Sequence, residues 1–349
     1  MNYYINEQNG NEKNALTKAR QDAAEILKDM GWQEKRIHRK IEGQNKLVHY
    51  FRMGYWTWRD WHRIIREIEP DSNILIQFPM INSLFFNEKA AQWIKMEKQK
   101  KNLKIILLIH DIDSIRFPEE KEKQYHHEQA FYEISDAIIA HNHKMKLYLE
   151  EIGLNKPIIE LGIFDYQMDA MVKKQSTEMQ KVVIAGNLNA EKAQYLNKLD
   201  QIKKIEFQLY GPNFSTNTEK QNVVFQGVYK PEELPEKIDG AWGLVWDGVS
   251  IDTCEGGYGN YLKYNNPHKL SFYMAMGMPV IIWKEAALAE FVEKNHVGIT
   301  VDHLSDIEKK IGQLGEAEYL SIKKNVEIIS KKVRDGVYLR DAVKKCINM

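Results

Sequence analysis

The sequence predicts an α/β protein built from two Rossmann-like, doubly wound domains that face a cleft. Short apolar runs alternate with helical patterns along the chain, which is typical of parallel sheets covered on both faces. The alternation pauses in the polar residues 164–180 and then restarts. The chain of 349 residues is also longer than one ordinary core needs. Ligands of such sheets bind beyond the carboxyl ends of the strands.

The first half of the chain is expected to form a domain of residues 1–163. Its first helix carries Ala19, Ala23 and Ile26 at helical spacing, and Gly31 marks its end. Its strands are short apolar runs separated by helical patterns. They are residues 3–6, 73–79, 104–111, 136–142 and 156–162.

The second half is expected to form a domain of residues 164–330 with its own parallel sheet. The tail, residues 317–349, predicts two helices, and its last part, 331–349, is expected to pack back on the first domain. The strands of the second sheet are again short apolar runs. They are residues 181–187, 205–211, 222–227, 241–248, 279–283 and 297–301.

Composition indicates a globular protein of a reducing compartment. Lys plus Arg and Asp plus Glu number 49 each, so charge favours no nucleic acid partner. Cys254 and Cys346 form no CxxC pair, which indicates neither a zinc site nor a disulfide framework. Residues 1–14 lack the pattern of a signal peptide, and no apolar run reaches the roughly 18 residues of a membrane span. We expect a cytoplasmic protein, with peripheral association at the inner face of the cell membrane left open.

The stretch "YNNPHKLSFYMAMGMPVII", residues 264–282, places His268 and Lys269 at the start of an apolar helix. Gly277 and Pro279 end that helix. Backbone amides at a helix start carry partial positive charge, and the two side chains add donors there. This pattern predicts a phosphate or diphosphate site. The plain alternative is a solvated lysine at a junction between loop and helix.

Several segments, in order along most of the chain, resemble bacterial galactofuranosyltransferases with the two-domain GT-B fold. They also resemble the glucosyltransferases that extend glycans on serine-rich adhesins. The most specific segment is "GLVWDGVSIDTCEGGYGNYLKYNNPHKL"; the others are "IHDIDSIR", "DAIIAHNHKMKLYLEEIG", "VIAGNLNAEKAQYL" and "QLYGPN". The resemblance implies transfer of a sugar from a UDP-linked donor, with no cofactor and no structural metal.

The resemblance also implies roles for individual residues of the second domain. Lys269 and Lys192 would neutralise the donor diphosphate, with Asn187 beside Lys192. Asp247 would bond hydroxyl groups of the donor sugar. Tyr210 would lie near the uracil or ribose, although an ordinary tyrosine at a strand end is the alternative.

One position departs from the pattern of many GT-B enzymes. Those enzymes hold the donor ribose with a glutamate on the helix that precedes "GxPV". In this chain the corresponding position is Phe272. The ribose contact must therefore come from another residue.

The catalytic base is expected in "IHDIDSIR", because its polar residues follow a strand of the first domain. His110 and Asp111 are the predicted base and its orienting partner, and either residue could take either role. The next candidates are Asp113 or a carboxylate in the loop of residues 6–18. The alternative is that Asp111 caps a helix and His110 packs at the strand end. Thr17 is predicted to bond the donor phosphate or the acceptor, or else only to cap the first helix.

Two other groups of residues have competing interpretations. Asp247 and Asp252 stand at roughly the spacing of hard-cation ligands, but the resemblance favours a loop beside the donor sugar. In "YFRMGYWTWRDWHRII", residues 50–65, Trp58 and Trp61 are expected in a core stripe that continues through Ile65 and Ile68. Tyr55 and Trp56 lie off that stripe and would stack on an acceptor sugar, touch lipid, or form a subunit interface.

These observations predict a metal-independent, inverting glycosyltransferase that acts in surface polysaccharide synthesis. Its donor would be UDP-galactofuranose, and its acceptor a hydroxyl of a lipid-linked or protein-linked glycan. Glucosyl transfer from UDP-glucose to a glycosylated adhesin is the close alternative. An alternative of another class is a non-catalytic nucleotide- or sugar-binding subunit of a glycosylation complex. A homo-oligomer is expected.

Overall fold

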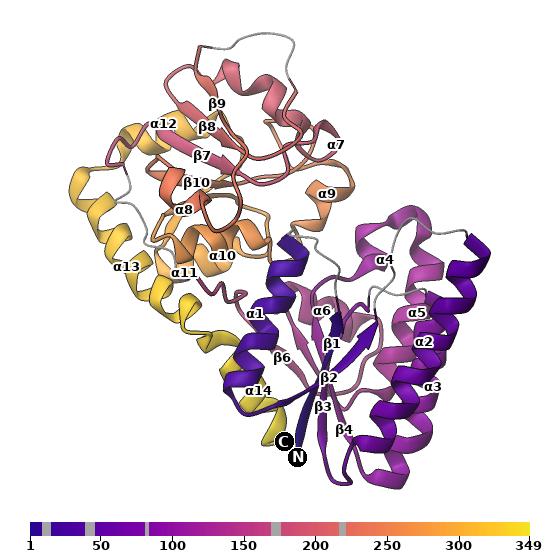
Figure 1. Cartoon of the computed structure of the whole chain (residues 1–349). Helices are drawn as coiled ribbons and strands as arrows, with labels where there is room; N and C mark the ends of the chain where they lie inside the picture. Colours follow the sequence, from indigo (N-terminus) through magenta and orange to yellow (C-terminus); the bar gives the residue numbers. More distant parts are fainter. Residues whose placement is uncertain (9–14, 39–45, 81–83, 169–175, 216–220) are drawn as a thin grey trace. The chain divides into compact units, whose positions relative to one another are not determined.

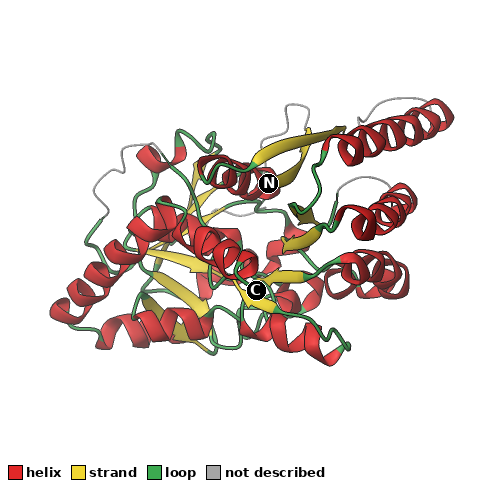
Figure 2. Ribbon diagram, turned by 90° about the horizontal axis from the view of Figure 1, so that it is seen from below, coloured by secondary structure: helices red, strands yellow, loops and turns green. Residues whose placement is uncertain are grey.

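The computed structural model of the chain describes residues 1–8, 15–38, 46–80, 84–168, 176–215 and 221–349. Its contacts divide the chain into two compact units. Unit 1 comprises Met1–Leu161 and Leu339–Met349, and unit 2 comprises Gly162–Tyr338. Each unit holds a six-stranded sheet with parallel strand pairs, flanked by helices (Figures 1 and 2). The described helices include none that is both long and apolar enough to cross a membrane.

The sheet of unit 1 has the strand order β2-β1-β3-β4-β5-β6. This is the flavodoxin-like order with one strand added, and its direction reverses between β1 and β3. In the central strands nearly every side chain is buried, because helices cover both faces. The strands are β1 (Asn2–Gln8), β2 (Gln33–His38), β3 (Asn73–Phe78), β4 (Lys104–Ile109), β5 (Ala137–Ala140) and β6 (Ile158–Glu160).

Strand β2 has no counterpart among the strands expected from the sequence. Its sequence, "QEKRIH", holds one apolar residue, Ile37, and that residue alone is fully buried. A polar strand is possible here because β2 lies at the edge of the sheet and pairs only with β1. A search for short apolar runs therefore does not find this edge strand.

The helices of unit 1 lie on both faces of its sheet (Figure 1). Helices α2, α3 and α5 form a layer on one face, and α1 covers the other. The last helix, α14, returns beside α1, where Arg340 pairs with Asp29 at 3.3 Å. The helices are α1 (Ala15–Asp29), α2 (Lys46–Glu67), α3 (Leu84–Lys101), α4 (Asp113–Arg116), the 3-10 turn Pro118–Glu120, α5 (Lys121–Ile134), α6 (His143–Glu151) and α14 (Val337–Ile347).

The sheet of unit 2 has the order β12-β11-β10-β7-β8-β9. Read from β9, this is the order of dinucleotide-binding Rossmann sheets, and its direction reverses between β7 and β10. Ligands of such sheets bind at that reversal, beyond the carboxyl ends of the strands. The strands are β7 (Lys181–Ala185), β8 (Glu206–Tyr210), β9 (Val223–Gly227), β10 (Trp242–Val245), β11 (Val280–Trp283) and β12 (Gly298–Val301).

The helices of unit 2 include several that are only one or two turns long. They are α7 (Ala190–Ala193), the 3-10 segment Gln194–Gln201, α8 (Leu234–Lys237), α9 (Gly256–Tyr261), α10 (His268–Ala275), α11 (Ala289–Asn295), α12 (Asp306–Gln313) and α13 (Glu316–Arg334). Helix α10 packs on α13 and on β10. The two helices expected in the tail are confirmed as α13 and α14.

The expected core stripe of α2 is partly wrong. Trp61 and Ile68 are buried as expected, but Trp58 is 49% exposed and Ile65 is only half-buried. The buried face instead runs through Trp61, Ile64 and Ile68. Trp58 lies on the other side of Trp61 from Ile64, because a helix turn takes 3.6 residues and steps of three in opposite directions diverge. Its aromatic side chain is therefore presented to solvent.

Candidate active site

Two lysines and one aspartate meet at the strand-order reversal of unit 2. Asp247 follows β10, Lys192 lies in α7 after β7, and Lys269 lies in the first turn of α10. The Lys269 Nζ donates to Asp247 Oδ1 at 2.7 Å and to the carbonyl of Trp246 at 3.3 Å. Lys192 Nζ lies 3.7 Å from the other oxygen, Asp247 Oδ2. One carboxylate is thus shared by two ammonium groups, and the cluster keeps a net positive charge.

Burial differs between the two lysines. The side chains of Lys269 and Asp247 are 13% and 7% exposed, whereas that of Lys192 is 32% exposed. Burial lowers the pKa of Lys269, and the nearby Lys192 charge acts in the same direction, while the Asp247 carboxylate opposes the shift. The pair with Asp247 therefore keeps a buried ammonium group charged in the absence of another anion.

Two glycine turns form the backbone above Lys269. Gly186 ends β7 and Gly211 ends β8, with φ angles of +132° and +143°. A Cβ atom on Gly211 would lie 1.8 Å from the carbonyl oxygen of Gly186, so only glycine permits this approach. A Cβ atom on Gly186 would lie 3.4 Å from Cε of Lys269. The side chain of Lys269 therefore packs directly against this glycine turn.

Asn187 is exposed at the same turn, at the carboxyl end of β7. Its Oδ1 accepts hydrogen bonds from the backbone of Asn189 at 3.1 Å and from Nδ2 of Asn213 at 2.9 Å. Asn189 in turn caps α7, which carries Lys192. Asn187 thus ties the glycine turn to the helix that presents the second lysine.

Tyr210 and His268 have partners within unit 2. The Tyr210 side chain is buried; its hydroxyl donates to the carbonyl of Lys237 and accepts from the backbone of Asp239. The ring of His268 lies 5.4 Å from that of Tyr166. These contacts hold both side chains in place within unit 2. They fit the alternative of an ordinary strand-end tyrosine for Tyr210.

Phe272 occupies the helix position at which the resemblance expects a ribose-binding carboxylate. It is buried, and its ring lies 5.5 Å from the ring of Tyr166. The phenyl ring therefore belongs to the core of unit 2. Helix α10, "HKLSFYMA", carries no carboxylate at any position.

The carboxylates of the loop after β10 form no metal cluster in the structure. Asp252 accepts from Ser250 Oγ at 3.2 Å, and its carbonyl lies 2.6 Å from Nδ1 of His303. Throughout the described ranges, no group of three or more His, Cys, Asp or Glu side chains could hold a metal ion. Asp247 faces the two lysines.

The polar residues after β4 form a second cluster, in unit 1. His110 is buried, and its Nε2 lies 2.8 Å from Gln77 Oε1. Gln77 donates through its amide nitrogen to the carbonyl of Arg20 at 3.3 Å, so its oxygen accepts and His110 Nε2 carries the proton. The basic nitrogen of this tautomer is Nδ1.

Asp111 does not cap the following helix. The N-cap position is Ile112, and no side-chain hydrogen bond caps this helix. Instead Asp111 Oδ2 accepts from Arg116 Nη1 at 3.1 Å. Asp113 lies 4.0 Å from the same guanidinium nitrogen. Burial, together with the charge of Asp111, raises the pKa of Asp113 to about 6, although Arg116 and Arg20 oppose the shift. Asp111 before α4 and Asp113 at its first position thus share the guanidinium of Arg116 at its last position.

Glu128 supports this cluster from α5. Its two oxygens accept from the backbone N–H of Ser114 at 2.9 Å and from Ser114 Oγ at 2.7 Å. Burial raises the pKa of Glu128 to about 7. Glu128 was not predicted from the sequence, because a single glutamate in a polar helical pattern carries no signal of burial. Arg116 was not predicted either, although "IHDIDSIR" contains it.

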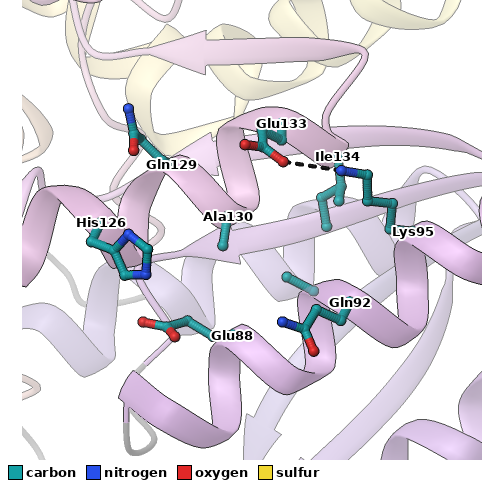
Figure 3. Close-up of a pocket in the computed structure, with 9 residues that line it drawn as sticks. Glu88, Gln92, Lys95, His126, Gln129, Ala130, Glu133 and Ile134 are labelled. Carbon is teal, nitrogen blue, oxygen red and sulfur yellow. Dashed lines mark hydrogen bonds and ion pairs between the residues drawn. The ribbon is translucent and has the colours of Figure 1, made fainter.

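Two remaining features lie apart from these clusters. Thr17 lies in α1, and its side chain is outside the described residues. A polar groove of about 250 Å³ runs between α3 and α5, with Lys95 and Glu133 paired across it at 3.1 Å (Figure 3). None of the site residues expected from the sequence lines this groove.

Comparisons with known proteins identify the family. Models of the glucosyltransferase 3-like N-terminal and C-terminal domains match residues 2–163 and 182–346. The chain is 31% identical to Beta-1,6-galactofuranosyltransferase WbbI of Escherichia coli (strain K12), over 99% of this chain and 98% of that protein. It is 27% identical to Glucosyltransferase 3 of Streptococcus parasanguinis, over 76% of each.

Solved structures share the fold at much lower identity. Trehalose-6-phosphate synthase OtsA matches with a TM-score of 0.60 and 9% identity, over 99% of both chains. It shares the GT-B arrangement of two Rossmann-like sheets. The chain is therefore a glycosyltransferase that belongs to the glucosyltransferase 3-like family and has the GT-B fold.

Proposed function

We propose that this glycosyltransferase moves galactofuranose from UDP-galactofuranose to a hydroxyl of an acceptor glycan in surface polysaccharide synthesis. The observation that carries the proposal is the 31% identity to a galactofuranosyltransferase across 99% of the chain. The glucosyltransferase 3 relatives are 27% identical over 76% and 79% of the chain. The acceptor glycan would be lipid-linked or protein-linked.

The charge of the lysine cluster supports a diphosphate donor. Departing UDP gains negative charge as the glycosidic bond breaks, and fixed positive groups stabilise that charge. Lys269 and Lys192 already share one carboxylate, so a diphosphate would take over ammonium partners that Asp247 holds. Asp247 would then be released to bond hydroxyl groups of the donor sugar. No divalent metal is required in this scheme.

The cluster after β4 supports an inverting displacement. The acceptor hydroxyl attacks the anomeric carbon while a base takes its proton, and UDP leaves from the opposite face. Asp111 is the proposed base, since its carboxylate is partly exposed whereas His110 is buried. His110 then acts as the orienting partner. Asp113 remains the next candidate.

A donor comparison tests the proposal. The protein is incubated with UDP-galactofuranose, UDP-galactopyranose or UDP-glucose and a panel of acceptor glycans, and products are measured by mass spectrometry. We expect transfer from UDP-galactofuranose, with an inverted anomeric centre by NMR. Transfer from UDP-glucose alone would overturn the donor assignment, and retention of configuration would overturn the single displacement.

Glucosyl transfer to a glycosylated adhesin is the second candidate. It is supported by the family models, which match both halves of the chain and are described as glucosyltransferase 3-like. Both proposed activities would use the lysine cluster and the same base. They differ in the donor sugar that the enzyme accepts. The same donor comparison therefore decides between them.

A further inference from the structure

We propose that the solvent side of helix α2 docks the protein on the surface of an anionic lipid bilayer. This side, the α2 docking face, consists of two adjacent rows along the helix. The aromatic row is Phe51, Tyr55 and Trp58, and the basic row is Arg52, Arg59, Arg63 and Arg66. The proposal goes beyond the sugar transfer itself, because it concerns where the enzyme works.

The aromatic row is exposed to an unusual degree for large apolar side chains. Phe51, Tyr55 and Trp58 are 74%, 57% and 49% exposed. Their spacing of four and three residues places them on one side of the helix. The rings of Tyr55 and Trp58 lie 6.3 Å apart, and the ring of His62 lies 5.0 Å from that of Trp58. His62 also contacts Trp93 of α3 at 4.8 Å, so the aromatic surface continues onto the next helix.

The basic row lies directly beside the aromatic row, since Arg52 follows Phe51 and Arg59 follows Trp58, and Arg63 and Arg66 continue the same side of the helix. The guanidinium of Arg52 lies 4.2 Å from the ring centre of Trp56, and that of Arg59 lies 6.0 Å from the ring centre of Tyr55. Within the described part of the chain, no ion pair is formed by Arg52 or Arg66. Their charge is available to a partner.

Acidic groups near the α2 docking face offset only part of its charge. Asp60 is buried behind it, where its carboxylate is bonded to His38 and Arg59 and lies 3.9 Å from Arg63. Glu67 pairs with Lys35 of the neighbouring strand β2 at 2.9 Å. The helix carries five basic and two acidic residues in its sequence "KLVHYFRMGYWTWRDWHRIIRE". The exposed side is therefore strongly positive.

The opposite side of α2 is fixed in the protein core. Met53, Trp61 and Ile64 are buried there. Helix α2 stands at the end of its layer, where it contacts α3 and β2 (Figure 1). The helix therefore cannot turn its aromatic row inward, and that row must face either solvent or a partner.

The aromatic row and the basic row together indicate which kind of partner the α2 docking face binds. Aromatic rings with arginines beside them are typical of helices that lie in the interface of a bilayer, where rings reach the headgroup level and cations bind anionic lipid. A second copy of the chain fits less well, because both partners would bring the same net positive charge to the contact. The charge of the α2 docking face is complementary to an anionic bilayer.

Vesicle binding tests the proposal with the full-length chain. The protein is sedimented with phosphatidylcholine vesicles, with or without phosphatidylglycerol, at low and at high salt. We expect binding only to the anionic vesicles, weakened by salt. The variant Arg52→Gln/Arg66→Gln should bind about 30-fold more weakly, since each basic residue near a bilayer contributes about 1 kcal/mol. Phe51→Ser should also weaken binding, but with little change in salt dependence.

A matched control removes the same charge elsewhere. Lys309 and Lys310 are exposed on α12, so Lys309→Gln/Lys310→Gln should bind like the wild type. Transfer to a water-soluble acceptor should be unchanged in every variant. Absent binding to anionic vesicles, equal loss in the control, or preferential binding of duplex DNA would overturn the proposal. Light scattering that shows a dimer abolished by Phe51→Ser would assign the α2 docking face to a second copy.

Discussion

At the scale of single residues, Asp247 is the centre of the candidate donor site. It holds Lys269 at 2.7 Å and Lys192 at 3.7 Å, and all three follow strands or begin helices at the reversal of one sheet. Another anion can take the place of this carboxylate in the ion pairs with the two ammonium groups. The cluster is thus arranged to exchange an internal partner for a diphosphate.

Removal of Lys269 should weaken UDP binding by about 1.5–3 kcal/mol, because one charge-assisted contact is lost. Lys192→Ala should cost less, since this side chain is more exposed. Calorimetry with UDP measures both. The control is Lys263→Ala, a lysine of the same unit paired with Glu285 at 2.8 Å, which should leave affinity unchanged.

The variant Lys269→Ala also leaves Asp247 with one partner, which lowers stability for a reason unrelated to UDP. The double variant Lys269→Ala/Asp247→Asn removes that stranded charge. We expect it to recover stability while UDP affinity stays low. If affinity recovers together with stability, Lys269 does not bind the diphosphate.

The base of the reaction is the second question at the residue scale. Asp111→Asn keeps the shape of the side chain and removes the base, so turnover should fall by about 10²–10⁴-fold while UDP affinity holds. His110→Ala should lower turnover less, because His110 is buried and donates to Gln77. Steady-state kinetics measures both variants. Asp71→Asn, exposed in the loop before β3, is the control. If both variants keep wild-type turnover, Asp113 becomes the candidate for the catalytic base.

At the scale of elements, α5 holds the start of α4 through one buried carboxylate. Glu128 binds the backbone and the hydroxyl of Ser114, and α4 presents Asp113 and Arg116. The pKa values of Glu128 and Asp113 are both raised, to about 7 and about 6. The junction of these two helices is therefore sensitive to pH.

The sign of this effect follows from proton binding. The folded protein holds the Glu128 proton up to about pH 7, whereas the unfolded chain releases it near its ordinary pKa of 4.5. The folded state therefore binds more protons in this window, and its stability falls as pH rises through it. The raised pKa of Asp113 adds to this fall in stability. His127 acts oppositely, because burial lowers its pKa to about 4.

Glu128→Gln should remove the contribution of Glu128, since the amide can still accept from the Ser114 backbone and donate to its hydroxyl. The unfolding free energy of the variant minus that of the wild type should increase by roughly 2–3 kcal/mol from pH 5 to pH 8. Urea unfolding at the two pH values measures this difference. Glu133→Gln, exposed on the same helix, should show no such gain. A gain equal in both variants would refute the buried-charge explanation.

At the scale of the whole molecule, two sheets with different strand orders divide the chemistry. Unit 2 has the Rossmann order and carries the lysine cluster, and unit 1 has the flavodoxin-like order and carries the acid cluster. The structure places the return of the chain to unit 1 at Leu339. From the sequence, the domain boundary was expected at residue 163 and the returning helix at 331–349.

Metal independence is a prediction for the complete enzyme. Lysines rather than a cation would offset the phosphate charge, so activity should survive an excess of chelator. The measurement is transfer rate with and without EDTA, before and after magnesium or manganese is added. Loss of activity with EDTA and recovery with either metal would make Asp247 and Asp252 candidate ligands.

Local pattern in the sequence determined much of this protein. Apolar runs predicted β4, β7 and β10, because strands covered on both faces must be apolar along their length. Lys269 and Asp111 stood out because each joins a polar motif to a buried element. The roles of Lys192 and Asp247 beside Lys269 were implied by the resemblance to known glycosyltransferases, and the carboxyl ends of parallel strands are where such sheets bind their ligands.

Tertiary structure decided what depends on neighbours distant in sequence. Strand β2 exists because β1 offers an edge, and Trp58 is exposed because the buried face of α2 follows Trp61 and Ile64. Glu128 acquires its raised pKa only when α5 packs over α4. Asp247 is shared by two lysines because packing sets the direction of each side chain. Burial and charge pairing are properties of the assembled core, and no local pattern of residue types encodes them.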